Sequence, residues 1–368
     1  MARPRLRDLG ITIGRLPTGE YNAITDVPGV LVGHSTIVHD EPRVARTGVT
    51  MIVPREGAIW RDLAFAGYFS FNGCGEMTGL PWIEEAGVLH TPIGITNTNA
   101  VGVVRDALAA YPTEHPERVN LPPAVAASWT GSLPVAAETW DGWLSDIEAF
   151  HVTREHAFAA LAAAKGGHVE EGNVGGGTGM ICHEFKGGIG TSSRLVGCLD
   201  ARYTVGVLVQ ANYGSRALLR VDGVPIGYEL GYGVVPSPWV EPPTGGSIIV
   251  VIATDAPLLP VQCKRLARRA TVGLARAGSI GDNGSGDIFL AFSTGNHLPA
   301  GATDLLDIKM LPHDQLGLFF EAVAEAVEEA ILNALTAAET MTGWRGRTAY
   351  ALPLEELQRV MAKYRPRS

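Results

Sequence analysis

The sequence predicts an α+β protein in which sheets lie sandwiched between helices. Three observations lead to this fold class. The predicted strands and helices come in clusters, whereas a doubly wound parallel sheet requires strict alternation of strand and helix. The five branched residues from Ile248 to Ile252 are typical of a strand buried on both faces. Apolar residues recur every three or four positions between about 314 and 340, which predicts a long helix with one buried face.

The part of the chain before residue 215 contains short elements separated by loops rich in glycine and proline. Runs of branched residues predict strands, and apolar spacings of three and four predict helices. The expected elements are strands at 30–34, 48–53 and 204–214, and helices at 78–85, 101–110 and 153–165.

The part after residue 245 has longer elements. A tight glycine-rich loop at 281–287 should lie directly before a strand. The expected elements are strands at 247–253 and 288–293, and helices at 258–277, 314–340 and 354–363.

The composition and charge of the chain limit the classes of protein to which it can belong. At 368 residues with 46% hydrophobic and 18% charged residues, the chain can bury a substantial core in one large or two ordinary domains. The net charge of −9 makes nucleic-acid binding a poor prospect. The densest basic cluster is expected to be a solvated helix face; it consists of Lys264, Arg265, Arg268 and Arg269. No apolar window spans a membrane and the N-terminus lacks a signal peptide's apolar core, so we expect no membrane partner and a cytoplasmic location.

Metal and cofactor motifs are absent from the sequence. The four cysteines are widely spaced, and neither CxxC nor HExxH occurs. The glycine-rich segment 172–190 lacks dinucleotide-binding spacing, because Met180 stands where a third glycine is needed. A closely packed structural turn is favoured there over an anion-binding loop. We therefore expect no metal and no cofactor.

The stretch around Ser247 is the candidate catalytic element. Gly245 and Gly246 directly precede this serine, which directly precedes the apolar run, so a sharp bend could hold Ser247 at the head of a rigid strand. The alternative is an ordinary glycine turn with an incidental serine. Serine is a weak nucleophile without a base, and no GxSxG elbow is present. If the bond before Ser247 were cut, the new α-amine, with a pKa of ~7.7–8.0, could act as that base.

Longer motifs carry a resemblance to a known family. They are DLGITIG at 8–14, NAITDVPGV at 22–30, the run 175–190 with MICH at 180–183, and the segment from Gly246 to Leu258. In these motifs, which are spread over nearly the whole chain, the sequence resembles the DmpA/BapA family of serine aminopeptidases of the N-terminal-nucleophile type. The resemblance implies a single αββα sandwich, like that of DmpA and ornithine acetyltransferase. It also implies a precursor that cuts itself between Gly246 and Ser247 into fragments 1–246 and 247–368.

The resemblance also assigns roles to individual residues. Ser247 matches the nucleophile, and Ser285 with Asp287 matches the supporting Ser-Gly-acid loop. Asn212, in QANYG at 210–214, matches the amide that stabilises the oxyanion. Glu138 matches the carboxylate that binds the substrate ammonium, although from the residues alone a solvated carboxylate at a loop edge is the simpler interpretation.

Two residues depart from the family pattern. Trp140 stands where members often have a tyrosine, whose hydroxyl can assist the oxyanion or the cleavage, and Trp offers only an indole N–H. Asp287 is one methylene shorter than the glutamate of members that favour β-amino acids. Both departures affect the site's shape and leave open whether L-α, D-α or β residues are preferred.

The expected function is removal of the N-terminal residue from small peptides, amides or esters. Two alternatives stay open at this point. One is an acyltransferase of the ornithine acetyltransferase type, although that group typically uses threonine as its nucleophile. The other is an uncut, non-catalytic binding protein. The resemblance further implies a homo-oligomer of the paired fragments, which we expect to be a tetramer of heterodimers.

Overall fold

The computed structural model describes residues 3–123, 125, 133–239 and 246–365. Gly245, to which the sequence assigned part of the bend before Ser247, lies outside these ranges. Within them, the strands pair into two main sheets and two short hairpins. No helix in these ranges is both long and apolar enough to cross a membrane.

The first sheet has the order β1-β2-β5-β6 and the second has the order β4-β3-β12-β11-β10-β9. The strands of the first sheet are β1 (Leu31–His39), β2 (Ala45–Val53), β5 (Ile93–Asn97) and β6 (Val135–Thr139). Those of the second are β4 (Val88–Leu89), β3 (Asp62–Ser70), β12 (Ser285–Pro299), β11 (Gly246–Thr254), β10 (Ala201–Asn212) and β9 (Gly188–Cys198). The hairpins are β7 (Ile181–Cys182) with β8 (Phe185–Lys186), and β13 (Met341–Thr342) with β14 (Thr348–Ala349).

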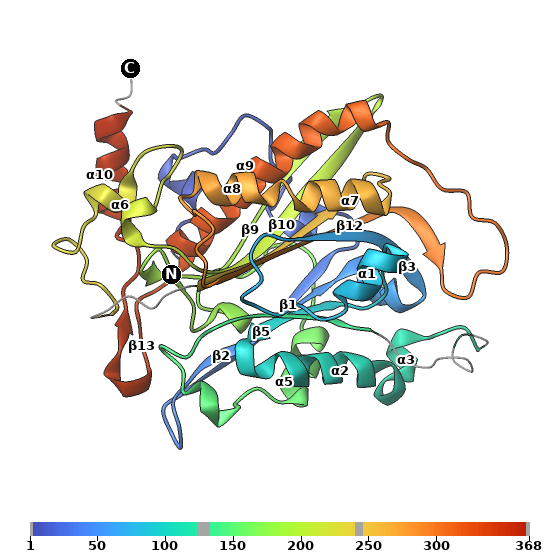
Figure 1. The fold of residues 1–368 in the computed structure, drawn as a ribbon, viewed down its shortest axis with the longest axis horizontal. Coiled ribbons are helices and arrows are strands. Elements are labelled where there is room, and N and C mark those ends of the chain that lie inside the picture. Colours follow the sequence, from blue (N-terminus) through green and yellow to red (C-terminus); the bar gives the residue numbers. More distant parts are fainter. Residues whose placement is uncertain (1–2, 124, 126–132, 240–245, 366–368) are drawn as a thin grey trace.

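Helices cover the outer face of each sheet. The described helices are α1 (Leu80–Ala86), α2 (Val101–Glu114), α3 (Pro116–Val119), α5 (Arg154–Ala162), α6 (Ile226–Glu229), α7 (Pro260–Ala267), α8 (Ala270–Arg276), α9 (Gly317–Ala337) and α10 (Leu354–Tyr364). In Figure 1, α2 and α5 lie under the first sheet, whereas α7, α8 and α9 lie over the second. The order helix, sheet, sheet, helix is the expected αββα sandwich.

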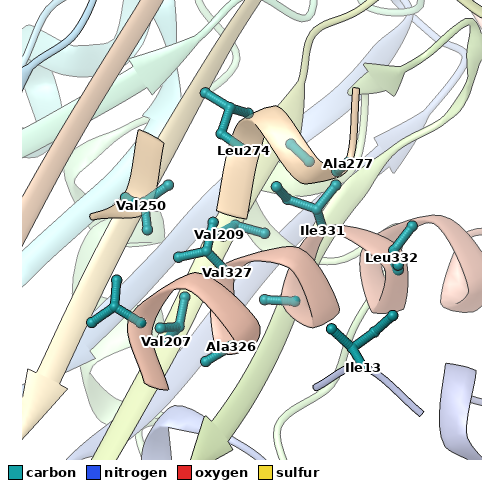
Figure 2. Packing of buried hydrophobic residues seen from close by; sticks show 14 of the residues in the cluster. Ile13, Val207, Val209, Val250, Leu274, Ala277, Ala326, Val327, Ile331 and Leu332 are labelled. Carbon is teal, nitrogen blue, oxygen red and sulfur yellow. The ribbon is translucent and has the colours of Figure 1, made fainter. Parts of the chain in front are cut away.

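The alternation of side chains along β11 explains why this strand is apolar throughout. Ile248, Val250 and Ile252 pack in the core between the second sheet and its helices. Figure 2 shows Val250 facing this layer, together with Val327 and Ile331 of α9. The intervening residues of β11 point the other way, into the core between the two sheets. Each face of the strand thus has a hydrophobic layer of its own.

A buried ion network joins the second sheet to α9. Arg194 on β9 is completely buried and donates to the carboxylates of Glu325, at 2.9 Å, and Glu329, at 2.7 Å. The periodicity of this helix predicted its apolar face but gave no sign of these buried carboxylates. A buried guanidinium needs such partners, because an unpaired charge in this layer would be strongly destabilising.

The structure corrects several predicted elements. The helix expected at 258–277 is two helices, because α7 packs on β3 and β12 whereas α8 packs on α9. The strand expected at 288–293 begins earlier, at Ser285, so the expected loop 281–287 ends inside β12. β9 was not expected, because its glycines suggested a turn.

The basic cluster on α7 is less solvated than expected. The guanidinium of Arg269 lies 4.1 Å over the Phe320 ring, and that of Arg268 lies 5.5 Å over the Phe69 ring. Lys264 pairs with Glu84 at 2.5 Å. These side chains therefore cover apolar surface between α7 and its neighbours, as well as facing solvent.

The glycine-rich segment packs as closely as the sequence suggested. A Cβ on Gly177 would lie 2.4 Å from the backbone nitrogen of Ile189, and one on Gly188 would lie 2.0 Å from the carbonyl oxygen of Gly172. No side chain fits at such distances. The segment therefore serves as a tightly packed structural connection into β9.

We predict that Gly190→Ala destabilises the protein, because a Cβ at this position of β9 would lie 2.0 Å from the Ala330 carbonyl oxygen on α9. Overpacking of this kind costs about 1–3 kcal/mol. Thermal unfolding measures the loss. Gly197→Ala is the matched control on the same strand, because a Cβ there meets nothing within 4 Å. Equal stability of the two variants would contradict the predicted contact.

Candidate active site

Three strand ends meet at one edge of the second sheet. In the antiparallel pair of β10 and β11, Asn212 lies opposite Ser247. In the parallel pair of β11 and β12, Ser247 lies opposite Gly286, and Gly246 lies opposite Ser285. Hydrogen bonding within the sheet thus fixes Ser247 between Asn212 and the Ser-Gly-Asp segment. The structure brings these sequence-predicted residues together.

The surroundings of Ser247 are tightly packed. Its side chain is only 6% exposed, and its Oγ accepts a hydrogen bond from the Gly286 N–H at 3.1 Å. A Cβ on Gly246 would lie 2.7 Å from the Asn212 carbonyl oxygen, so the residue before the serine must be glycine. The expected bend at Gly246 is wrong: this residue is the first of β11 and has no left-handed φ. Close approach of β10 requires the glycine there.

Ser285 and Asp287 form a hydrogen-bonded pair at the start of β12. The Ser285 Oγ donates to Asp287 Oδ1 at 2.6 Å, and the Asn72 amide donates to Asp287 Oδ2 at 3.1 Å. Burial raises the pKa of Asp287, and the hydrogen bonds from Ser285 and Asn72 oppose that rise. Sequence reasoning missed Asn72, which reaches this pair from the end of β3 and carries no motif.

The amide of Asn212 is fixed on two sides. Its Oδ1 accepts the Ile181 N–H at 2.8 Å, and its Nδ2 donates to the Trp140 carbonyl oxygen at 3.0 Å. An amide nitrogen carries two N–H groups, and among the described residues Nδ2 makes this one hydrogen bond. A second donor is therefore available beside Ser247.

Glu138 is a buried carboxylate, not the solvated one that its sequence context alone favoured. It lies on β6 with only 3% of its surface exposed. One oxygen accepts the Glu76 N–H at 2.9 Å and the other accepts the Thr98 hydroxyl. Burial raises the pKa of Glu138, and these two hydrogen bonds partly offset the rise. Such a partly desolvated carboxylate interacts strongly with a cation.

A pocket of ≈610 Å³ joins these groups. Glu138, Asn212 and Ser247 all line it, so the carboxylate from the first sheet faces the same space as the serine from the second. Trp140 also lines the pocket and is 42% exposed. Trp143 and Trp239 complete an aromatic wall that the sequence analysis did not find, because no spacing links them.

Asp141 is a second carboxyl group that sequence reasoning missed. It is fully buried three residues after Glu138. Burial raises its pKa to about 7; the Thr47 hydroxyl and the Asn97 amide oppose the rise, and the charge of Glu138 adds to it. Asp141 therefore titrates near neutral pH directly behind the pocket wall.

This arrangement suits attack by a hydroxyl on a carbonyl group. Ser247 supplies the oxygen, the free N–H of Asn212 can donate to a developing oxyanion, and Glu138 can hold a cation at a distance. No set of three or more His, Cys, Asp or Glu side chains in the described ranges is placed to hold a metal ion.

Comparisons with known proteins agree with this geometry. The sequence matches the model of Peptidase family S58 over residues 22–349. It is 47% identical to beta-peptidyl aminopeptidase BapA of Sphingosinicella microcystinivorans, over 98% of this chain and 93% of that protein.

Two solved structures have the same fold over nearly their whole length. A beta-aminopeptidase of Burkholderia sp. superposes with a TM-score of 0.91 at 50% identity, covering 99% of this chain and 100% of that one. The L-aminopeptidase D-Ala-esterase/amidase of Ochrobactrum anthropi, described as a variant of the Ntn hydrolase fold, superposes with a TM-score of 0.90 at 44% identity. That match covers 98% of this chain and 99% of the other.

We predict that Asp141 makes stability fall as pH rises. Its folded-state pKa of about 7 exceeds its ordinary value of 3.8, so the stabilisation is complete below the ordinary value and is lost as pH rises through about 7. Relative to wild type, Asp141→Asn should gain about 1–4 kcal/mol between pH 4 and pH 8, at ~1.4 kcal/mol per pKa unit. Urea unfolding at both pH values measures this gain.

The control for this prediction is Asp304→Asn, which changes an exposed carboxylate that does not line the pocket. Its stability relative to wild type should change little with pH. A pH-independent difference between Asp141→Asn and wild type would show that Asp141 does not titrate in this range.

Proposed function

Because this chain belongs to Peptidase family S58, we propose that it is a self-processing serine aminopeptidase that removes the N-terminal residue from peptides, amides or esters. The observation that carries the proposal is the placement of Ser247 at the head of β11, in one pocket with Asn212 and the buried Glu138. The relatives reported above are named aminopeptidases, and none of them is named an acyltransferase.

Maturation is the first step of the proposed mechanism. The Ser247 Oγ attacks the carbonyl carbon of Gly246, and the C–N bond breaks as the Ser247 nitrogen takes up the proton lost by the hydroxyl. Water then hydrolyses the ester, which leaves a carboxylate on Gly246 and a free amine on Ser247. The Gly286 N–H supports this step, because it holds the hydroxyl oxygen at the strand head before cleavage.

Turnover uses the same hydroxyl on an external carbonyl group. The α-amine of Ser247 takes the proton, or the Ser285 hydroxyl takes it while passing its own proton to Asp287 through their 2.6 Å hydrogen bond. The proton then goes to the departing amine or alcohol, and water hydrolyses the ester left on Ser247. The free N–H of Asn212 stabilises the oxyanion, and one such donor is typically worth about 2.7–4 kcal/mol. Glu138 binds the substrate ammonium, which restricts cleavage to the first residue.

We predict that Ser247→Ala remains a single chain of 38.9 kDa and is inactive, because neither the acyl shift nor turnover can begin without the hydroxyl. Denaturing electrophoresis of fresh protein should show fragments 1–246 and 247–368 in wild type and a single band in Ser247→Ala. Ser35→Ala, which removes a hydroxyl on β1, should be cut as wild type is. A single wild-type band would exclude self-processing, and a cut Ser247→Ala would point to another protease.

We predict that Glu138→Gln lowers kcat/KM for free-amine substrates by about 10–100-fold, the equivalent of ~1.5–3 kcal/mol for a lost charge-assisted contact. N-acetylated substrates lack the ammonium and should lose far less. The acid side of the wild-type pH profile should lie above the usual range of a glutamate, because burial raises the pKa of Glu138 and only its ionised form binds the cation. This limb should disappear in Glu138→Gln. Equal losses on both substrate types would remove Glu138 from amine binding.

The class of N-terminal residue is open between L-α, D-α and β, since the named relatives include both beta-aminopeptidases and an L-aminopeptidase. A panel of p-nitroanilides that differ only in this residue distinguishes the classes. Such a panel tests how two features affect the preferred class of N-terminal residue. One is the shape of the pocket beside Trp140, and the other is Asp287, whose side chain is one methylene shorter than a glutamate.

Assembly and location form the last part of the proposal. We expect the paired fragments to associate in the cytoplasm as a homo-oligomer, a tetramer of heterodimers. An exposed apolar segment supports association, since Leu305, Leu306, Ile308 and Met310 all project from the loop after β12. Light scattering coupled to gel filtration gives the mass, and a mass of about 39 kDa would contradict assembly.

A further inference from the structure

The pocket has a charged end at Glu138 and an aromatic end at Trp143 and Trp239, and the strand order of the second sheet places each end relative to Ser247. The Glu138 end lies on the β12 side of Ser247. A Cβ on Gly286 would lie 2.6 Å from the Cα of Gly75, so the 74–76 segment rests directly on β12. The same segment donates the Glu76 N–H to Glu138. A Cβ on Gly75 would lie 2.9 Å from the Gly286 Cα and 3.3 Å from Glu138 Oε1, so the carboxylate lies beside this contact, on the β12 side of Ser247.

The aromatic end lies on the β10 side. Ile181, which donates its N–H to Asn212 of β10, packs in one cluster with Trp143 and Trp239. The two indole rings meet edge to face, with centroids 5.5 Å apart and planes at 84°. Since β11 lies between β12 and β10, Ser247 stands between Glu138 and this tryptophan pair along the pocket.

We propose that Trp143 and Trp239 form a leaving-group subsite that prefers an aromatic or large aliphatic group after the scissile bond. The inference rests on the proposed function, in which Glu138 holds the ammonium and Ser247 attacks the carbonyl carbon. With these two points fixed, the substrate continues past Ser247 toward β10. Its second residue, or the amine or alcohol part of an amide or ester, then meets the tryptophan pair.

The surface offered there is apolar and preorganised. The Nε1 atoms of both Trp143 and Trp239 are buried, so the rings show carbon to the pocket. The guanidinium of Arg347 lies 3.9 Å over the Trp143 ring and its Nη1 donates to the Trp143 carbonyl oxygen at 3.5 Å. A rigid aromatic wall favours an apolar group by burial and by ring contacts, with little loss of side-chain entropy.

The test varies the leaving group alone. The N-terminal residue that the enzyme cleaves best is coupled to ammonia, to glycine amide and to phenylalanine amide, and kcat and KM are measured for each. Wild type should show a kcat/KM about 10–100-fold higher for the phenylalanine amide than for the other two, mainly through KM. Trp239→Ala should lose most of this preference, because its kcat/KM should fall at least several-fold more for the phenylalanine amide than for the simple amide.

Trp82→Ala provides the matched control, because it removes a 41%-exposed tryptophan from α1, outside the pocket. This variant should keep the preference. If Trp239→Ala does not fold, Trp143→Leu serves in its place. A second measurement needs no variant: N-acetyl-phenylalanine amide, which has no ammonium for Glu138 to bind, should inhibit wild type at lower concentration than N-acetyl-glycine amide does.

Each outcome decides one claim. Equal kcat/KM for the three substrates in wild type, or an equal loss for all of them in Trp239→Ala, would overturn the subsite. A Trp239→Ala change that instead alters the preference among N-terminal residues would also overturn it, by placing the pair on the other side of the scissile bond. Wild type inactive toward every member of the panel would contradict the proposed function itself.

Discussion

The pairing of β11 with β10 on one side and β12 on the other is the constraint on which the site depends. Because β11 is antiparallel to β10 and parallel to β12, the start of two strands and the end of a third meet at one edge of the sheet. Backbone hydrogen bonds then set Ser247 beside Asn212 and Gly286. Both faces of β11 are buried in apolar cores, and a shift of its register by one residue would move Ser247 away from Asn212.

The stacking of the two sheets brings a carboxylate into the pocket that contains Ser247. Glu138 comes from β6 of the first sheet, yet it lines the same pocket as Ser247 of the second. The Glu76 N–H and the Thr98 hydroxyl donate hydrogen bonds to its carboxylate, so the group can be held out of bulk water. Burial raises the pKa of Glu138, and these two hydrogen bonds reduce that rise. Under the proposed function, an ammonium bound by this shielded carboxylate would fix the distance from the chain end to the cleaved bond.

The aromatic wall of the pocket comes from segments outside the central strands of both sheets. Trp143 follows β6, Trp239 belongs to the connection after α6, and Arg347 lies in the β13–β14 hairpin. Their contacts are aromatic and cationic, and they give the pocket an apolar end opposite its charged one. The charged end and the apolar end of the pocket thus come from different parts of the fold.

Close approach of backbones, not local bending, accounts for Gly246 and Gly286. Gly246 lies in β11 and leaves room for the Asn212 carbonyl, while Gly286 leaves room for Gly75. These contacts join segments more than thirty residues apart. The glycine before the serine was visible in the sequence, but its reason was a tertiary one.

The sequence by itself determined the α+β class with sheets between helices and the doubly buried strand that begins beside Ser247. Through the family motifs it also determined the αββα sandwich and the residues that meet at its site. These features are local or are carried by long continuous motifs, so a linear chain displays them. Only the tertiary structure decided that Glu138 is buried, that Asn72 supports Asp287, that Asp141 lies fully buried behind the pocket, and that Trp143 and Trp239 form a wall. Burial and contacts between distant segments depend on how sheets and loops stack, which no spacing along the chain records.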